Sequence, residues 1–290
     1  MTIHAIQSEA GRSLEVATLG SPSTEAVIFH HGTPGSYKSG LGLHLYAQTQ
    51  GAFVISFSRA GYGKSDRNKS RAVIENVKDV QIILEHFGIK KFVSIGQSGG
   101  GPYCLADTTL SQNRGAVNVA GVGAYGVDEL NFFEGMGEGG RDEYRAAIAG
   151  EESLENWMKE RSAGAANVTG PHIIEVLGGS LGVADKIALD FETAEYMAAG
   201  ARHALFSGYY GWMDDDLALV KPWEFDLSAI SKPVELWTGG DDLVVPSSHG
   251  EWLHGKIAHS KMFFVPGEGH MSLAKNKREE IISHALAYLN

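Results

Sequence analysis

One serine stands in a short glycine-rich segment, Gly96-Gln97-Ser98-Gly99-Gly100, directly after an apolar run and before a helical stretch that begins near Gly101-Pro102. Glycines two residues on either side of a serine suit a turn from strand to helix that is too tight for larger side chains. Such a turn exposes the hydroxyl and places backbone N–H groups at the start of a helix beside developing negative charge. The pattern predicts that Ser98 is a nucleophile, and the alternative is a tight turn with a structural role only.

A serine hydroxyl is a weak nucleophile near neutral pH, so it needs a base and a third group that orients the base. His270 follows the apolar run KMFFVPGEG and precedes the last helical stretch, which predicts a base on a loop at the carboxyl end of a strand. Two carboxylates follow the preceding apolar run, PVELWTGG, and we expect Asp242 to be the acid and Asp241 to be a solvated or turn-capping neighbour. Asp128 is a further candidate, one strand earlier.

The segment His30-His31-Gly32-Thr33-Pro34-Gly35 follows another apolar run. We expect the Thr33 N–H to point into the pocket opposite the N–H of Gly99, so that the two hold a developing oxyanion. The alternative is a loop that merely leaves the strand. His30 and His31 are not expected to bind a metal, because neighbouring residues of a strand point to opposite faces and no Cys or acidic cluster accompanies them.

Strand-sized apolar runs that alternate with amphipathic stretches must position these residues. The runs cover 26–32, 52–58, 91–96, 115–126, 233–240 and 261–269, and the clearest helical stretch is 74–88, closed by Gly88. Alternation of this kind predicts an α/β fold with a mostly parallel sheet of about eight strands and helices on both faces. An opening pair near 2–7 and 13–19 is expected to form a hairpin at one edge.

The alternation stops from 128 to 228, where the chain becomes rich in glycine, glutamate and aromatic residues. We interpret 128–228 as an inserted helical cap on a core domain made of 1–127 and 229–290. Gln97 beside the nucleophile, and Tyr209 and Trp212 in the cap, are expected to contact substrate. The run Asp214-Asp215-Asp216 is expected to be a solvated face, although one or two cap carboxylates could instead hold a free substrate amine.

Composition excludes several classes of function. A formal net charge of −11 leaves no basic stripe for a nucleic acid, and one cysteine, Cys104, cannot form an internal disulfide. The N-terminus lacks a signal-peptide pattern, and no apolar run has the length of about 18 residues that a membrane span needs. We expect a cytoplasmic protein with a small-molecule substrate, no metal or organic cofactor and no membrane partner, and a homodimer is left open.

Five segments, HHGTPGS, SRAGYGKSD, GQSGGGP, GDDLVVP and GEGH, occur in an order and approximate spacing that resemble the α/β-hydrolase superfamily. The resemblance covers the chain outside the cap and is closest to single-chain serine hydrolases, the esterase and proline iminopeptidase-like branch. It implies the α/β-hydrolase fold, the triad Ser98, Asp242 and His270, and oxyanion N–H groups from Thr33 and Gly99.

Two departures from these relatives concern the pocket. Such proteins usually read D-R-P-G-Y-G where this chain has Ser58-Arg59-Ala60-Gly61-Tyr62-Gly63, which could alter the pocket entrance. Proline iminopeptidases commonly carry two glycines before the proline of the oxyanion loop, where this chain has Gly32-Thr33-Pro34. The second departure weighs against peptidase activity.

The sequence therefore predicts a hydrolase that cleaves a small to medium carboxylic ester, lactone or thioester through an acyl-enzyme on Ser98. A proline iminopeptidase-like aminopeptidase or amidase is the first alternative. A non-catalytic member that keeps the pocket and only binds a ligand is the second.

Overall fold

The computed structural model describes residues 1–8, 11–178 and 181–290. Within these residues the chain forms one eight-stranded sheet with the order β1-β2-β4-β3-β5-β6-β7-β8. The pairs β1–β2 and β2–β4 are antiparallel, and all other neighbours are parallel. The strands are β1 (Thr2–Gln7), β2 (Ser13–Leu19), β3 (Glu25–His30), β4 (Val54–Phe57), β5 (Lys91–Gln97), β6 (Asn113–Val119), β7 (Val234–Gly239) and β8 (Ser260–Val265).

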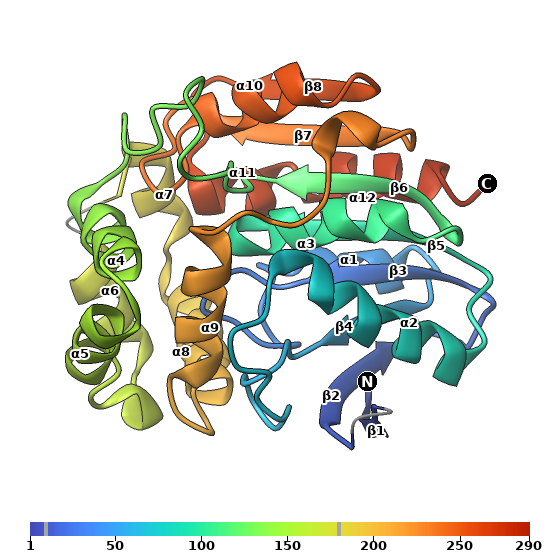
Figure 1. Ribbon diagram of the computed structural model, residues 1–290, viewed down its shortest axis with the longest axis horizontal. Helices are drawn as coiled ribbons and strands as arrows, with labels where there is room; N and C mark the ends of the chain where they lie inside the picture. The colour runs from blue at the N-terminus through green and yellow to red at the C-terminus, as the bar shows by residue number, and fades with distance from the viewer. Residues whose placement is uncertain (9–10, 179–180) are drawn as a thin grey trace.

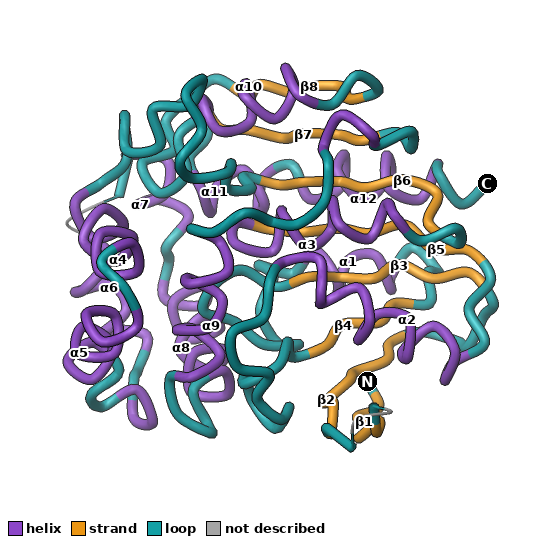
Figure 2. The backbone as a smooth tube through the Cα atoms, in the orientation of Figure 1, coloured by secondary structure: helices purple, strands orange, loops and turns teal. Residues whose placement is uncertain are grey.

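Helices cover both faces of this sheet, as Figures 1 and 2 show. The helices α2 (Asn76–Phe87), α3 (Gly101–Ala106) and α10 (Ser247–Lys256) share one apolar cluster with the sheet. The helices α1 (Leu43–Thr49), α11 (His270–Asn276) and α12 (Arg278–Ala287) share the cluster on the other face. No described helix is long and apolar enough to cross a membrane.

Strand β3 shows why the central strands read as continuous apolar runs. Ala26 and Ile28 pack into the first cluster, whereas Val27 and Phe29 pack into the second. Side chains of a strand alternate between faces, so a strand with helices on both sides must be apolar at every position. All four residues are fully buried.

The predicted α/β architecture is confirmed, with eight strands and helices on both faces. The opening hairpin has the predicted bounds, since β1 and β2 span 2–7 and 13–19. Helix α2 ends at Gly88, which has a left-handed φ of 66°. The longest predicted run, 115–126, overestimated β6, because the strand ends at Val119 and a loop continues the apolar sequence.

Between β6 and β7 the chain forms a group of helices that Figure 1 shows at the carboxyl ends of the parallel strands. They are α4 (Glu138–Ile148), α5 (Glu151–Arg161), α6 (Gly170–Gly178), α7 (Val183–Ala188), α8 (Phe191–Ala204) and α9 (Tyr210–Leu219). We call these helices the insertion. They lie inside the predicted cap segment 128–228, of which residues 179 and 180 are outside the described part, and the division into two domains stays a prediction.

The insertion and the core meet in a tight backbone contact between two glycines. Gly211 of α9 lies against Gly61 in the loop after β4, and a Cβ built on Gly211 would stand 2.6 Å from the Gly61 carbonyl carbon. A Cβ built on Gly61 would stand 2.8 Å from the Gly211 Cα. Neither side of this contact has room for a side chain.

We expect Gly211→Ala to lower the melting temperature by several degrees, because forcing a methyl group into a packed contact costs about 1–3 kcal/mol. Gly139→Ala is the matched control, since Gly139 lies in helix α4 and a Cβ there meets nothing within 4 Å. That variant should melt at the same temperature or slightly higher, because alanine favours a helix over glycine by up to about 1 kcal/mol. Thermal unfolding followed by circular dichroism measures both, and equal melting temperatures would contradict the tight contact.

Candidate active site

Ser98 stands where β5 ends and a short 3₁₀ turn (Ser98–Gly100) leads into α3. Its φ is 55°, a left-handed value that non-glycine residues rarely adopt and that marks a strained turn. The flanking glycines are needed for space, because a Cβ on Gly96 would lie 2.8 Å from the Cys104 Sγ and one on Gly100 would lie 2.6 Å from the His31 carbonyl oxygen. The serine is partly exposed at this turn.

His270 is the first residue of α11, and its Nδ1 lies 2.8 Å from Oδ2 of Asp242. The other oxygen of Asp242 accepts the backbone N–H groups of Val244 and Val245, both at 2.8 Å. These bonds hold the carboxylate in one orientation, with one oxygen left for the imidazole. The arrangement holds the imidazole in the tautomer that leaves Nε2 free to accept a proton.

The other two acid candidates lie elsewhere. Asp241 precedes Asp242 but its side chain is exposed, and its backbone N–H donates to Glu268 O at 2.9 Å. Asp128 is exposed on the loop after β6. Only Asp242 among the three makes a hydrogen bond to His270 in the described residues.

The electrostatic surroundings of His270 favour its protonated form. Burial lowers the pKa of the imidazole, but the charge and hydrogen bond of Asp242 and the charge of Asp185 outweigh burial, so that the pKa is raised above its ordinary value. His249 lies near the same acid without sharing it, because its Nδ1 accepts the Gly123 N–H and its Nε2 donates to Phe132 O. Burial is the main cause that lowers the pKa of His249 to about 4.

The structure brings Ser98 and His270 to the same end of the sheet, since both follow the carboxyl end of a parallel strand. In the described part of the chain no hydrogen bond joins the Ser98 hydroxyl to the imidazole. The pair of His270 and Asp242 is therefore assembled in this structure, and the third member lies at the same rim without being bonded to it.

The loop after β3 lies directly against the serine turn. A Cβ built on Gly99 would stand 3.2 Å from the Thr33 amide nitrogen, and one built on Gly32 would stand 3.3 Å from the Ser98 Cβ. The backbone of residues 32–33 thus flanks the serine opposite the start of the 3₁₀ turn. The role of the Thr33 and Gly99 N–H groups as oxyanion donors stays a prediction.

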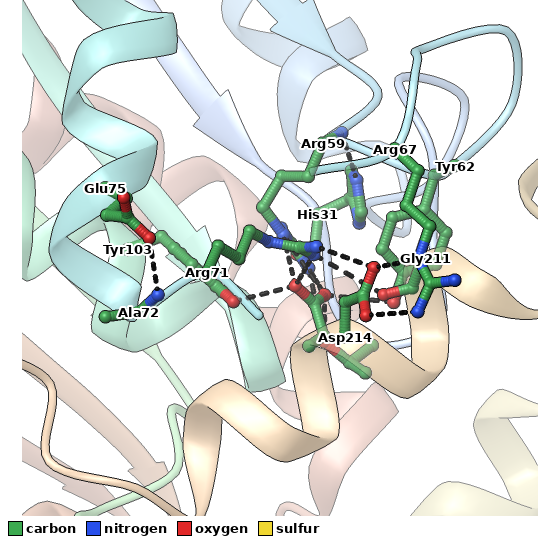
Figure 3. A network of polar contacts seen from close by, with 12 residues as sticks. His31, Arg59, Tyr62, Arg67, Arg71, Ala72, Glu75, Tyr103, Gly211 and Asp214 are labelled. Atoms are coloured by element: carbon green, nitrogen blue, oxygen red, sulfur yellow. Dashed lines mark hydrogen bonds and ion pairs between the residues drawn. The ribbon is translucent and has the colours of Figure 1, made fainter. Parts of the chain in front are cut away.

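A buried guanidinium binds the backbone of the loop after β3. Arg59, fully buried after β4, donates from Nη1 to His31 O at 2.5 Å and from Nη2 to Gly32 O at 3.3 Å. It also donates from Nη2 to the Thr33 hydroxyl oxygen at 3.2 Å. Figure 3 shows Arg59 and His31 within the same polar network. Arg59, the residue of Ser58-Arg59-Ala60 that agrees with the usual D-R-P, therefore supports the loop backbone from inside the core.

Asp215 of α9 neutralises that guanidinium. Its Oδ2 lies 2.5 Å from Arg59 Nη2, and its Oδ1 lies 2.5 Å from Arg71 Nη2. It also accepts three hydroxyl hydrogen bonds, from Thr33 at 2.9 Å, Tyr62 at 2.9 Å and Tyr103 at 2.7 Å. Burial raises the pKa of this carboxyl, but the charges of Arg59 and Arg71 outweigh it and the pKa is lowered, so Asp215 is ionised.

The expectation that Asp214-Asp215-Asp216 forms a solvated face is wrong. Their exposed fractions are 1%, 0% and 1%. The physical reason is that the core supplies the opposite charges: Asp214 pairs with Arg67 at 2.7 Å, and Asp215 pairs with two arginines. Paired charges can be buried where a lone run of like charge cannot. Figure 3 shows Arg67 and Arg71 approaching Asp214 from the core side.

The three predicted substrate contacts occupy different surroundings. Gln97 is buried at the end of β5. Trp212 donates its indole N–H to Glu143 at 2.6 Å, and the Tyr209 hydroxyl donates to Glu155 at 3.1 Å, both within the insertion. The two aromatic residues pack in an apolar cluster formed by helices of the insertion. Contact with substrate stays a prediction for all three.

The adjacent histidines at the end of β3 bind separate partners. His30 is bonded to Asp107 at 2.7 Å beneath the sheet, whereas His31 donates from Nδ1 to Gly32 O and accepts the Arg59 N–H at Nε2. Within the described ranges no group of three or more His, Cys, Asp or Glu side chains is arranged to hold a metal ion.

Sequence reasoning missed three residues that hold the site: Arg59, Asp215 and Asp185. Arg59 carried a signal, because it keeps the arginine of the D-R-P-G-Y-G pattern while the residues on either side of it differ. Asp215 carried a weaker one, as part of an acidic run. Asp185 is a single carboxylate in an ordinary amphipathic stretch, and no pattern in the sequence distinguishes it.

Comparison with known proteins agrees with this topology. A family model described as the alpha/beta hydrolase fold matches residues 25–108, which contain the loop after β3 and the serine turn. None of the curated protein sequences matches the chain. Many solved structures do.

Three of these structures illustrate the likeness. A bromoperoxidase from Bacillus anthracis is 20% identical, with a TM-score of 0.69 and coverage of 99% of both chains. An esterase from Rhodococcus sp. ECU1013 is 20% identical, with a TM-score of 0.67 over 100% of this chain and 99% of the other. The enzyme Est816, named for degrading N-acyl homoserine lactones, is 20% identical, with a TM-score of 0.64 over 96% and 97%.

The chain has the α/β-hydrolase fold, and the resemblance of its motifs to the α/β-hydrolase superfamily is confirmed. Sequence identities near 20% establish the fold alone. The reaction must therefore be argued from the site.

Replacing Asp242 by asparagine should lower the pKa of His270, because the charge that offsets burial of the imidazole is removed. Asp241→Asn is the matched control and should leave the titration unchanged, since that side chain is exposed and not bonded to His270. The pH titration of the His270 imidazole resonances by NMR measures both. An unaltered titration in Asp242→Asn would refute the pairing.

Proposed function

We propose that this protein is a serine hydrolase that cleaves small to medium carboxylic esters, lactones or thioesters through an acyl-enzyme on Ser98. The observation that carries the proposal is the bond between His270 and Asp242 at the sheet end where Ser98 stands in a left-handed turn. A strained serine, a buried imidazole held by a carboxylate, and two flanking N–H groups together are the parts of acyl transfer.

In the proposed reaction the Ser98 Oγ attacks the substrate carbonyl carbon while its proton passes to His270 Nε2. The carbonyl oxygen becomes an oxyanion held by the N–H groups of Thr33 and Gly99. His270 then gives the proton to the departing alcohol, and the acyl group stays on Ser98. Water attacks the acyl-enzyme in the same way, with His270 again taking and returning a proton.

Two further points support this reading. Catalytic hydrogen bonds of ligand-free sites are often long and tighten only with substrate, so the unbonded Ser98 is compatible with a nucleophile. Two of the similar structures are named as an esterase and as an enzyme that degrades N-acyl homoserine lactones, which favours an ester or lactone here. The proposed partner is therefore a small-molecule substrate, and the proposed chemistry uses side chains and backbone N–H groups of the protein together with water.

Ser98→Ala should lower turnover of a p-nitrophenyl ester by about 10⁴- to 10⁶-fold, because the attacking oxygen is lost. Steady-state kinetics measures this loss, and a fluorophosphonate probe should label the wild-type chain rapidly at Ser98. Ser36→Ala, which removes a buried serine hydroxyl outside the proposed triad, should retain both activities. Slow labelling of a folded wild-type chain would favour the non-catalytic alternative, and a fully active Ser98→Ala variant would end the proposal.

An aminopeptidase or amidase is a second candidate, and one observation favours it. Asp216 of α9 is buried, and neither of its oxygens accepts a hydrogen bond from an N–H or hydroxyl group in the described residues. Its polar neighbour is Glu143 of α4, and burial raises the pKa of Glu143 to about 7 and that of Asp216 well above its ordinary value. Both shifts favour the protonated forms of these carboxyl groups, and a free substrate amine could bind here as a cation in place of such a proton.

A panel of p-nitrophenyl esters, lactones, thioesters and aminoacyl p-nitroanilides at one enzyme concentration separates the two candidates. We expect kcat/KM to be highest for the esters, lactones or thioesters, because burial favours the protonated forms of Asp216 and Glu143 and so weakens their attraction for an amine. Asp216→Asn should change those rates little. A preference for aminoacyl substrates that Asp216→Asn abolishes would establish the second candidate instead.

A further inference from the structure

Asp185 of α7 is a fully buried carboxylate in the insertion, and within the described residues its side-chain hydrogen bonds all go to the start of α11. Its Oδ2 accepts the backbone N–H of His270 at 2.8 Å. Its Oδ1 accepts the N–H groups of Met271 at 2.8 Å and Ser272 at 2.9 Å. One side chain from the insertion thus binds three consecutive N–H groups, and the first belongs to His270.

The chain before α11 cannot supply this cap itself. The residue that precedes the helix is Gly269, which has no side chain to accept the first N–H groups. A Cβ built on Gly269 would stand 2.5 Å from the Asp185 carboxyl carbon. The absence of a side chain on Gly269 therefore leaves room for the carboxylate of α7 beside the first turn of α11. This need for space accounts for a glycine directly before His270.

Asp185 is one of two carboxylates that act on the imidazole, and the neighbouring charged side chains on α11 and on the loop before it bind other partners. Asp242 lies on the loop after β7 and bonds Nδ1. On α11 itself Lys275 pairs with Asp190 at 2.7 Å, and on the loop before α11 Glu268 accepts from Asn276 at 3.1 Å. His249 of α10 faces Asp242 and is neutral, because its pKa is lowered to about 4.

A base that takes a proton from serine becomes a cation in the transition state, so negative charge nearby stabilises it. Asp242 supplies such charge and also selects the tautomer. Asp185 supplies a second negative charge on the backbone side of the same residue, and its three hydrogen bonds fix where that backbone stands. A displacement of the base by about 1 Å can cost about 10²-fold in rate.

Resting on the proposed function, we propose that Asp185 is a positioning residue of the site: a carboxylate that the insertion delivers to the His270 turn, holding the base in place and stabilising its cationic form. The insertion thereby contributes to the reacting geometry as well as to the entrance of the site. The contact joins α7 to α11 across 85 residues of sequence.

Asp185→Asn tests this, because asparagine has a similar shape but no charge, and its amide nitrogen cannot accept the backbone N–H groups. We expect kcat for a p-nitrophenyl ester to fall about 10- to 100-fold with KM nearly unchanged. The acid limb of the kcat/KM profile should move to lower pH, because the pKa of His270 falls when the charge is lost. NMR titration of the imidazole should move in the same direction.

Asp190→Asn is the matched control, since Asp190 is also a carboxylate of the insertion bonded to α11, through Lys275. We expect it to keep the wild-type kcat, KM and His270 titration. Wild-type kcat and titration in a folded Asp185→Asn variant would overturn the inference, and so would an equal effect of Asp190→Asn.

Gly269→Ala is the second variant, for the case in which Asp185→Asn does not fold. Its methyl group displaces the carboxylate while the charge remains, so kcat should fall in the same way, and a wild-type kcat would overturn the inference. The imidazole titration separates this result from the proposed function, because it requires no turnover. If Ser98→Ala kept full activity, the proposed function would fail, whereas a lowered His270 pKa in Asp185→Asn would still establish the positioning contact.

Discussion

A charged group removed from water must be paired or hydrogen-bonded where it lies, and this constraint explains how the candidate site is held. Asp215 and Asp185 are both fully buried, and both belong to helices inserted between β6 and β7. Asp215 pairs with Arg59, and Arg59 donates hydrogen bonds to the loop of residues 31–33. Asp185 accepts the backbone N–H groups that begin at His270. Each carboxylate thus secures a different segment of the core beside Ser98.

These two contacts differ in what they contribute physically. The Asp215 network joins a carboxylate to Arg59 and Arg71, and taking such groups out of water costs about as much as their attraction returns. Its effect lies in geometry, because the planar guanidinium of Arg59 can satisfy the carboxylate and the loop carbonyls only in one arrangement. Asp185 instead accepts backbone N–H groups of α11, and its charge is one cause of the raised pKa of His270.

The insertion and the core are consequently joined by several contacts between charged or polar groups. Helix α9 meets the loop after β4 at the Gly61 and Gly211 contact, four positions before Asp215. Glu15 of β2 adds a further link, since its carboxylate lies 2.9 Å from His203 of α8. A substrate that displaces helices of the insertion would therefore alter both the loop around Thr33 and the position of His270.

Much of this protein follows from local sequence. The strands of the sheet were predictable because a strand buried on both faces must be apolar throughout, as residues 26–29 are. The turn at Ser98 was predictable in part because Gly96 is required by local contacts, with Gly100 and Cys104 of the same turn and helix, whereas Gly100 is required by the loop after β3. The pairing of Asp242 with His270 was also within reach, since both follow consecutive strands of one parallel sheet and must meet at its carboxyl edge.

The tertiary structure alone decided which polar groups are buried. By itself the run Asp214-Asp215-Asp216 resembles any solvated acidic face, and its burial depends on Arg59, Arg67 and Arg71, more than 140 residues earlier in the chain. Asp185 resembles any surface acid of a short helix until α7 is placed against α11. Local patterns determine which elements form, whereas the environment of a charge depends on partners that only folding brings together.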